Sequence, residues 1–301
     1  MSAISVSSSF PFGHYDELKI LSYAIPLICS IGADVRQSSL RALRTFAKRA
    51  VARIPFTGFG DPLLKGHPGG MRGISLPALY KVKSQKELSL ADTSAVRNLP
   101  PLPDTADELK ALSAAVNGDA KYIYLREAAT EKVVKSLDLS NSRIITFATH
   151  GLIAGDLKNA EPALVLTPPE KGTALDDGLL TSSEVAQLKL NADLVILSAC
   201  NTAAGDKADG AEGLSGLAKA FFYAGTRALL VSHWPVVSDA AVKLTTGMLG
   251  YRAKNPTSGR SEALRRSMLA LMNNKDKPHY AHPLFWAPFV LVGEGGAYDV
   301  K

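Results

Sequence analysis

Short apolar runs alternate with helix-like segments throughout the second half of the chain, and this alternation constrains the fold more than any other feature. Each run is bounded by glycine, proline or polar residues, as buried strands are, and the intervening segments have the lengths of helices. A strand followed by a helix and then by a parallel strand builds a sheet that is covered on both faces. The sequence therefore predicts an α/β fold with a mostly parallel central sheet and helices on both faces.

The expected elements follow from the same pattern. We expect strands at residues 121–125, 144–148, 164–166, 194–197, 227–232 and 289–292, and helices at residues 105–116, 130–137, 181–188, 212–223, 239–251 and 261–273. Thr181 and Glu184 are typical of a helix N-terminus, and Gly225 is typical of the residue just after a helix.

The first hundred residues are less regular. A helix is expected at residues 38–52, whereas residues 66–103 are rich in glycine, proline and lysine, as a long surface loop or an ordered insertion would be. We therefore divide the chain into an N-terminal part with a long loop, residues 1–103, and a core, residues 104–295. No self-similarity with the tetratricopeptide period of about 34 residues is visible.

Composition indicates an ordinary water-soluble globule. The chain has 301 residues, of which 46% are hydrophobic and 21% are charged. No apolar run is long enough to cross a bilayer, and the N-terminus lacks the features of a secretory signal. Two cysteines do not make a disulfide framework, so a reducing, cytoplasmic location is expected.

The net charge of +6 raises the question of an anionic partner. One local source is a basic cluster in the expected helix at residues 38–52 and just before it, formed by Arg36, Arg41, Arg44, Lys48, Arg49 and Arg53. No aromatic side chains for stacking on bases are interleaved with these residues. A solvated helix face explains the cluster better than nucleic-acid binding does, and we expect no nucleic-acid partner and no membrane association.

A histidine and a cysteine each follow a buried strand at the point where it ends. His150 comes just after the strand expected at residues 144–148, and Cys200 comes just after the strand at residues 194–197. The carboxyl ends of parallel strands meet at one edge of a sheet, so neighbouring strands would bring the two side chains together. A nearby imidazole favours the thiolate form of cysteine, which is the nucleophile. The alternative is that both residues are buried structural residues.

Beyond this pair, the chain resembles the CHAT domain, a caspase-like domain that usually lies beside tetratricopeptide repeats in bacterial proteins. His150 precedes Cys200 by about 50 residues, as in caspases. Residues 56–62 also resemble a strand-to-turn block of CHAT proteins, which places residues 1–103 in the N-terminal part of the CHAT region. The other matching blocks, in the family's order, are residues 147–151, 161–166, 177–181, 197–202, 211–218, 223–225, 233–236 and 282–293.

The resemblance implies a caspase-like fold and a cysteine endopeptidase that needs no cofactor or metal. Cys200 would attack the peptide carbonyl, and His150 would protonate the leaving amine. The backbone N–H groups of Cys200 and Gly151 would form the oxyanion hole. No third catalytic carboxylate is evident, and enzymes of this type generally work without an obligatory one.

Substrate specificity is predicted less directly. In related peptidases an acidic residue after the tryptophan-containing strand end selects a basic P1 residue. Here Asp239 is the nearest acid, one place later than usual, and it equally suits the first turn of the following helix. Further candidates for substrate binding are Trp234, Ser198 and Ser238, and Trp234 equally suits the core.

The partners that the resemblance implies are a protein substrate and a tetratricopeptide-repeat protein or domain. Because the chain lacks such repeats, we expect a peptidase that is latent until a repeat-containing partner activates it. The alternative, from another class, is a non-catalytic signalling module with a peptidase-like fold.

Three other features are weaker candidates for sites. His279 and His282 form a conceivable metal pair, but a metal site needs three or four converging ligands. The glycine-rich stretch at residues 66–70 lacks the lysine and the preceding strand of a phosphate-binding loop, so it is interpreted as a turn. Cys29 has no histidine in a comparable position and is interpreted as a small buried residue.

Overall fold

The computed structural model describes residues 52–66, 91–152, 161–199, 216–232 and 237–296. Its centre is a six-stranded sheet in the order β2-β1-β3-β7-β8-β9, in which every neighbouring pair is parallel except β8 and β9. The strands are β1 (Ile54–Pro62), β2 (Ile123–Arg126), β3 (Ser142–Ala148), β7 (Leu194–Leu197), β8 (Ala228–Ser232) and β9 (Phe289–Gly293).

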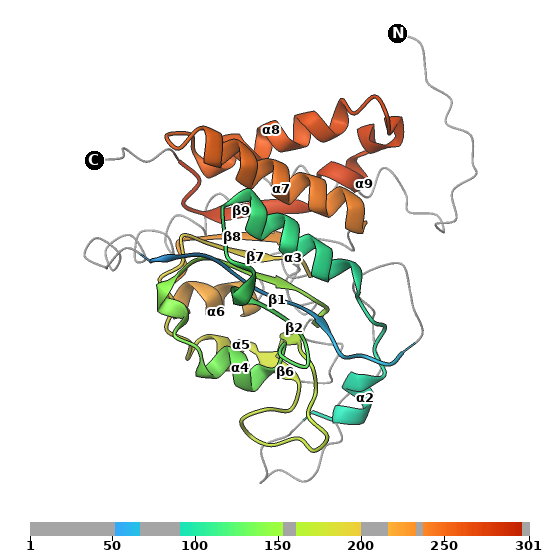
Figure 1. The fold of residues 1–301 in the computed structure, drawn as a ribbon. Helices are drawn as coiled ribbons and strands as arrows, with labels where there is room; N and C mark the ends of the chain where they lie inside the picture. The colour runs from blue at the N-terminus through green and yellow to red at the C-terminus, as the bar shows by residue number, and fades with distance from the viewer. Residues whose placement is uncertain (1–51, 67–90, 153–160, 200–215, 233–236, 297–301) are drawn as a thin grey trace.

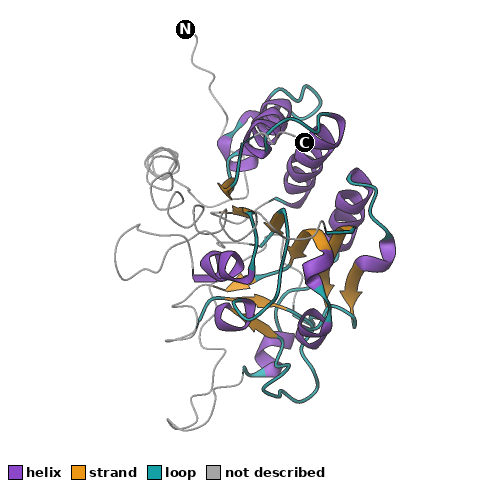
Figure 2. Ribbon diagram, turned by 90° about the vertical axis from the view of Figure 1, so that its left-hand side faces the viewer, coloured by secondary structure: helices purple, strands orange, loops and turns teal. Residues whose placement is uncertain are grey.

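Helices cover both faces of this sheet, as Figures 1 and 2 show. One face carries α3 (Asp104–Ala115) and α7 (Ser238–Lys254), and α8 (Arg260–Met272) packs on α7. The opposite face carries α4 (Glu131–Ser136), α5 (Ser182–Val185) and α6 (Gly216–Ala224). The predicted fold class, a mostly parallel α/β sheet between helices, is confirmed.

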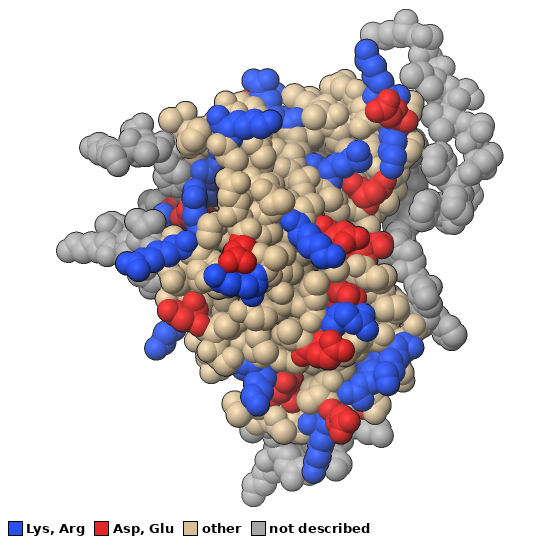
Figure 3. Space-filling view, viewed as in Figure 1, with Lys and Arg blue, Asp and Glu red and all other residues tan. Residues whose placement is uncertain are grey.

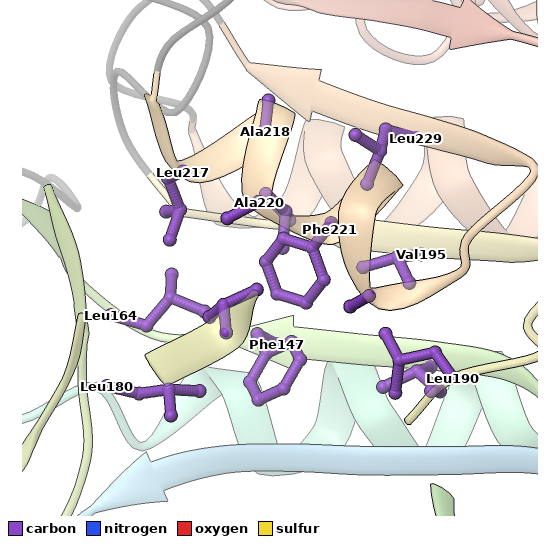
Figure 4. Packing of buried hydrophobic residues seen from close by; sticks show 14 of the residues in the cluster. Phe147, Leu164, Leu180, Leu190, Val195, Leu217, Ala218, Ala220, Phe221 and Leu229 are labelled. Atoms are coloured by element: carbon purple, nitrogen blue, oxygen red, sulfur yellow. The ribbon is translucent and has the colours of Figure 1, made fainter. Parts of the chain in front are cut away.

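Alternate residues of each strand supply the two halves of the core. Ile144 and Ile196 pack with α3 and α7, whereas their chain neighbours Ile145 and Val195 pack on the other face. On that second face the Phe147 ring lies 5.6 Å from the Phe221 ring of α6, measured between centroids (Figure 4). Complete burial of such side chains stabilises the fold by roughly 1.5–3 kcal/mol each, which explains why strands that are covered on both faces are apolar throughout.

A second, three-stranded antiparallel sheet continues directly from the His150 region. It contains β4 (Gly151–Leu152), β5 (Ala163–Val165) and β6 (Leu179–Thr181) in that order. The strand expected at residues 164–166 therefore forms, one residue earlier, in this small sheet and not in the parallel one. The helix α2 (Thr93–Arg97) packs against it through a separate apolar cluster that includes Val96, Leu99 and Leu152.

Several details differ from the expected elements. β1 lies between β2 and β3, so the central sheet contains a strand from the part of the chain before residue 104. α2 forms within the segment expected to be a long loop. The helix expected at residues 38–52, apart from its last residue, and the start of the one expected at residues 212–223 lie outside the described residues. Short helices are η1 (Ala120–Tyr122), η2 (Leu139–Asn141), η3 (Pro278–Ala281) and α9 (Pro283–Trp286).

Candidate active site

The strands that precede His150 and Cys200 are neighbours in the central sheet. β3 and β7 pair in parallel with Phe147 opposite Leu197, and the Ser198 N–H donates to the Phe147 carbonyl at 2.9 Å. Both apolar runs form strands as predicted, and the two strands are neighbours, as the dyad requires. Their carboxyl ends, and the residues that follow them, lie at the same edge of the sheet.

The backbone around His150 is fixed by β5. The His150 carbonyl accepts a hydrogen bond from the Val165 N–H at 2.9 Å, and the Thr149 hydroxyl donates to the Val165 carbonyl at 2.5 Å. His150 is only 2% exposed. His150 lies between β3 of the central sheet and β4 of the small sheet, and the bonds to Val165 fix its backbone. Its position therefore does not depend on a bound ligand.

The His150 ring is oriented by a backbone carbonyl. Its Nε2 lies 2.8 Å from the carbonyl oxygen of Pro100, in the segment between α2 and α3. A carbonyl oxygen only accepts, so Nε2 must carry a hydrogen, and in the neutral ring Nδ1 is then the basic nitrogen. Pro100 was not identified from the sequence, because every residue has a carbonyl and no side-chain pattern marks this one.

The chain leading to Cys200 is buried and anchored. Ser198 and Ala199 are both about as buried as His150, and the Ser232 hydroxyl at the end of β8 donates to the Ala199 carbonyl. Cys200 itself follows Ala199 directly and lies outside the described residues, as Trp234 does. The described structure thus positions Ala199, the residue before the candidate nucleophile, at the same edge as the histidine.

Gly151, the second predicted oxyanion donor, is the first residue of β4. It pairs with Leu164 of β5, and the neighbouring hydrogen bond from Val165 to His150 shows that this pair is of the non-hydrogen-bonded type. The N–H of Gly151 therefore points away from β5. This N–H takes no part in the hydrogen bonds between β4 and β5, as an oxyanion donor requires.

Asp239 and Ser238 begin α7, and Asp239 already has cationic and hydroxyl partners. Its carboxylate accepts from the Lys277 ammonium at 2.5 Å and from the Tyr280 hydroxyl. Burial opposes ionisation of the carboxyl, but the two contacts outweigh it and hold the pKa of Asp239 below its usual value. The structure thus places the carboxylate in the first turn of the helix, the alternative given above, with a lysine of the chain beside it.

The two histidines considered as a metal pair have other contacts. The His279 ring packs edge-on against Tyr280 and Phe285, and His282 Nδ1 accepts from the Leu284 N–H at 3.2 Å, which caps α9. Within the described ranges, no group of three or more histidine, cysteine, aspartate or glutamate residues could hold a metal ion.

Surface charge and helix length bear on the other partner classes. Figure 3 shows lysine and arginine side chains interspersed with acidic ones over the face viewed. Of the basic cluster noted in the sequence, only Arg53 falls within the described residues. None of the helices in the described part of the chain combines the length and apolarity needed to cross a membrane.

The fold and the buried strand-end histidine define a mixed α/β protein with a candidate active site at the carboxyl edge of its parallel sheet. The family model of the CHAT domain matches residues 30–294. This chain belongs to the CHAT domain family.

Relatives and solved structures give further comparisons. The chain is 34% identical over 123 residues to mouse (Mus musculus) tetratricopeptide repeat protein 28 and 33% identical over 127 residues to the human (Homo sapiens) protein. These matches cover 41% and 42% of this chain but only 5% of each relative.

Among solved structures, the Arg-specific cysteine proteinase gingipain R is similar with a TM-score of 0.45 and 10% identity, over 87% of this chain and 52% of that one. A complex of the pro- and mature domains of the Porphyromonas gingivalis proteinase gives a TM-score of 0.46 and 10% identity, over 86% and 52%.

Proposed function

We propose that this protein is a caspase-like cysteine endopeptidase in which His150 and Cys200 form the catalytic dyad. The observation that supports this most is the orientation of His150. Its ring is buried at the end of β3, its Nε2–H is directed to the Pro100 carbonyl, and the neighbouring strand leads within three residues into Cys200. A buried imidazole with a fixed tautomer suits a base whose other nitrogen faces a thiol.

The proposed reaction begins with proton transfer from the Cys200 thiol to Nδ1 of His150. The thiolate forms a bond to the scissile carbonyl carbon, and the carbonyl oxygen becomes an oxyanion bound by the N–H groups of Gly151 and Cys200. Collapse of this intermediate breaks the C–N bond as the imidazolium gives its proton to the amine nitrogen. Water, deprotonated by His150, then hydrolyses the thioester and releases the acid and the thiol.

The Pro100 carbonyl takes the orienting role in this scheme. When the ring becomes an imidazolium, both nitrogens carry hydrogens, and the bond to Pro100 becomes charge-assisted and stronger. The ion pair that precedes attack is therefore favoured without a third carboxylate. Ser198, Trp234 and Ser238 stay proposals for the substrate-binding surface, and Asp239 stays a proposal for the basic P1 preference.

Control by a repeat-containing partner is the second part of the proposal. The partial similarity to tetratricopeptide repeat proteins supports an association with such repeats. A partner that binds only the competent state can raise that state from 1% to about 50% with roughly 2.7 kcal/mol of binding energy. This is within the range of a modest interface.

The experiment is proteome-wide mapping of new N-termini after incubation of a cell extract with the chain, alone and with a candidate repeat partner. Cys200→Ala is the matched control in both arms. We expect new termini that depend on Cys200 and become more numerous with the partner. Identical termini for wild type and Cys200→Ala in both arms would instead support the non-catalytic signalling module.

A further inference from the structure

The segment that carries Pro100 is fixed by hydrogen bonds of residues that take no part in the proposed reaction. We propose that Arg97 and Gly66 are positioning residues for the catalytic histidine, because they fix the backbone that presents the Pro100 carbonyl to His150. This inference rests on the proposed function and adds two residues to its machinery. Neither residue contacts His150 in a described bond, so both act through Pro100.

Arg97 binds two carbonyls with one nitrogen. Its Nη2 donates to the carbonyl oxygens of Pro168 and Pro169, at 2.9 Å in both cases. Arg97 is the last residue of α2, three residues before Pro100. Two hydrogen bonds from one planar guanidinium restrict the position of the C-terminal end of α2 more than a single bond would.

The loop that Arg97 binds is itself fixed to the body of the protein. The Thr167 N–H donates to the Ala129 carbonyl at 2.8 Å, and the Thr167 hydroxyl donates to the Arg126 carbonyl at 2.5 Å. Arg126 ends β2 of the central sheet. Arg97 therefore links the Pro100 segment to the same sheet that carries His150.

Gly66 and the residue before it also contact the Pro100 segment. Its N–H donates to the Leu99 carbonyl at 3.0 Å, and the preceding N–H, of Lys65, donates to the Arg97 carbonyl at 2.6 Å. A Cβ at Gly66 would lie 2.1 Å from the Asn98 carbonyl oxygen and 2.7 Å from that of Leu99. Any side chain here must push residues 98 and 99, which directly precede Pro100.

The fold of α2 does not depend on these polar contacts alone. Val96 and Leu99 are buried against Leu152, Val165 and Leu179 of the small sheet, and the Ala91 N–H donates to the Asp177 carboxylate at 2.7 Å. Loss of the Arg97 side chain should therefore leave the segment folded but less narrowly placed. Orientation of His150 and stability of the chain can be measured separately for this reason.

The test is the pH dependence of Cys200 alkylation by iodoacetamide in the 301-residue chain, alone and with a candidate repeat partner, quantified by mass spectrometry. The variants are Arg97→Ala, Arg97→Lys and Gly66→Ala. The matched controls are Arg266→Ala, an exposed arginine paired with Glu262, and Gly250→Ala, where no atom lies within 4 Å of an added Cβ. Thermal unfolding of each variant gives the stability.

We expect Arg97→Ala and Gly66→Ala to slow alkylation at pH 6 about tenfold, which corresponds to about 1.4 kcal/mol, the size of a hydrogen bond to a charged group. Arg97→Lys should recover part of the loss, and the midpoint of the alkylation profile should move toward that of an ordinary thiol. Both controls should match wild type.

Two outcomes would overturn different claims. Fast alkylation in wild type that is unchanged in Arg97→Ala and Gly66→Ala would refute the positioning role and leave the proposed function intact. An ordinary thiol profile in wild type, both alone and with a candidate repeat partner, would refute the dyad itself. Equal losses in the variants and in the two controls would show that the effect is not specific to the Pro100 segment.

Discussion

The two edges of the central sheet are held by different chemistry. At the amino edge, the Asp193 carboxylate, just before β7, accepts from Arg143 and Arg227 at 3.1 Å each, and the buried Arg260 lies 4.0 Å from it. At the carboxyl edge, His150 is held by neutral backbone groups of Val165 and Pro100. At the amino edge a carboxylate and arginines pair with one another, whereas the two described bonds of His150 are to neutral backbone groups.

This difference supports the placement of the proposed chemistry at the carboxyl end of β3. Arg260 is 1% exposed, and a buried guanidinium is costly unless acidic groups and carbonyls surround it, as Asp193 and the Glu294 carbonyl do here. Such a network favours one charge state and one geometry. A carbonyl partner instead orients an imidazole in both its neutral and its charged form, so the ring can exchange a proton.

The largest expected effect is at the carboxyl edge. Cys200→Ala and His150→Ala should each reduce proteolysis at least ~10³-fold, because residues that act as one unit fail together. Thermal unfolding should show that both variants remain folded. Substantial cleavage by Cys200→Ala, or loss of wild-type activity on addition of a chelator, would contradict a thiol mechanism.

The amino edge should respond in the opposite way. Asp193→Ala leaves three arginines without their shared carboxylate and should lower the free energy of unfolding by about 2 kcal/mol, less than for a fully buried pair because Asp193 is partly exposed. Cys200 alkylation should not change. If the variant instead kept its stability and lost alkylation, the distinction between the two edges would be wrong.

A third region, between α4 and the loop before β6, allows a test by pH. Burial raises the pKa of Glu131 to about 8, although Lys135 and the Asp177 N–H contact its carboxylate and Glu184 shares the lysine. The folded state therefore binds this proton more tightly than the unfolded state, whose carboxyl titrates near 4.5. The contribution to stability is complete below pH 4.5 and is lost as pH rises toward 8.

Glu131→Gln should flatten the stability profile between those pH values, because glutamine imitates the neutral acid at every pH. Urea unfolding of wild type and variant across pH 4.5 to 8 measures this. Asp176, Asp177 and Glu184 also face this loop and titrate in both proteins, so the difference between the two curves reports Glu131 together with its interaction with Glu184 through Lys135. Parallel curves would refute the raised pKa.

The smallest effect on stability is expected at Asp239. Its pair with Lys277 is about half exposed, so Asp239→Asn should cost under about 1 kcal/mol. If Asp239 selects basic P1 residues, the variant should lose a preference for arginine and lysine in a peptide library. Asp104→Asn, which changes the matching first-turn acid of α3, is the control. An apolar or acidic P1 preference in wild type would contradict this role.

The sequence predicted the two strands that end at the candidate site. Strands buried on both faces consist of continuous apolar runs, which are visible in the sequence. The run at residues 194–197 coincides with β7, and the strand before His150 begins only two residues earlier than expected. The small sheet was less predictable, since its two- and three-residue strands depend on tertiary pairing.

Pro100, Gly66 and Arg97 could not be found from sequence for a different reason. Each of their contacts ends on a backbone carbonyl far away in the chain or belongs to one, such as the Pro100 carbonyl with the His150 ring and the Gly66 N–H with the Leu99 carbonyl. A backbone carbonyl carries no residue-type signal, and a glycine required by close approach looks like a glycine in any turn. Residues 66–70 are interpreted as a turn from the sequence because they lack the signature of a phosphate-binding loop, and nothing in that pattern marks the contact of Gly66 with Leu99.

The most direct test of the His150–Cys200 pair compares the two cysteines of one chain. Iodoacetamide labelling of Cys200 and Cys29 in the same sample, with a candidate repeat partner present and from pH 5 to pH 9, gives both profiles by mass spectrometry. We predict that Cys200 reacts well below the pKa of about 8.5 of an ordinary thiol and that His150→Ala removes this reactivity without changing Cys29. A Cys200 profile with an ordinary midpoint, identical in wild type and His150→Ala, would contradict the account.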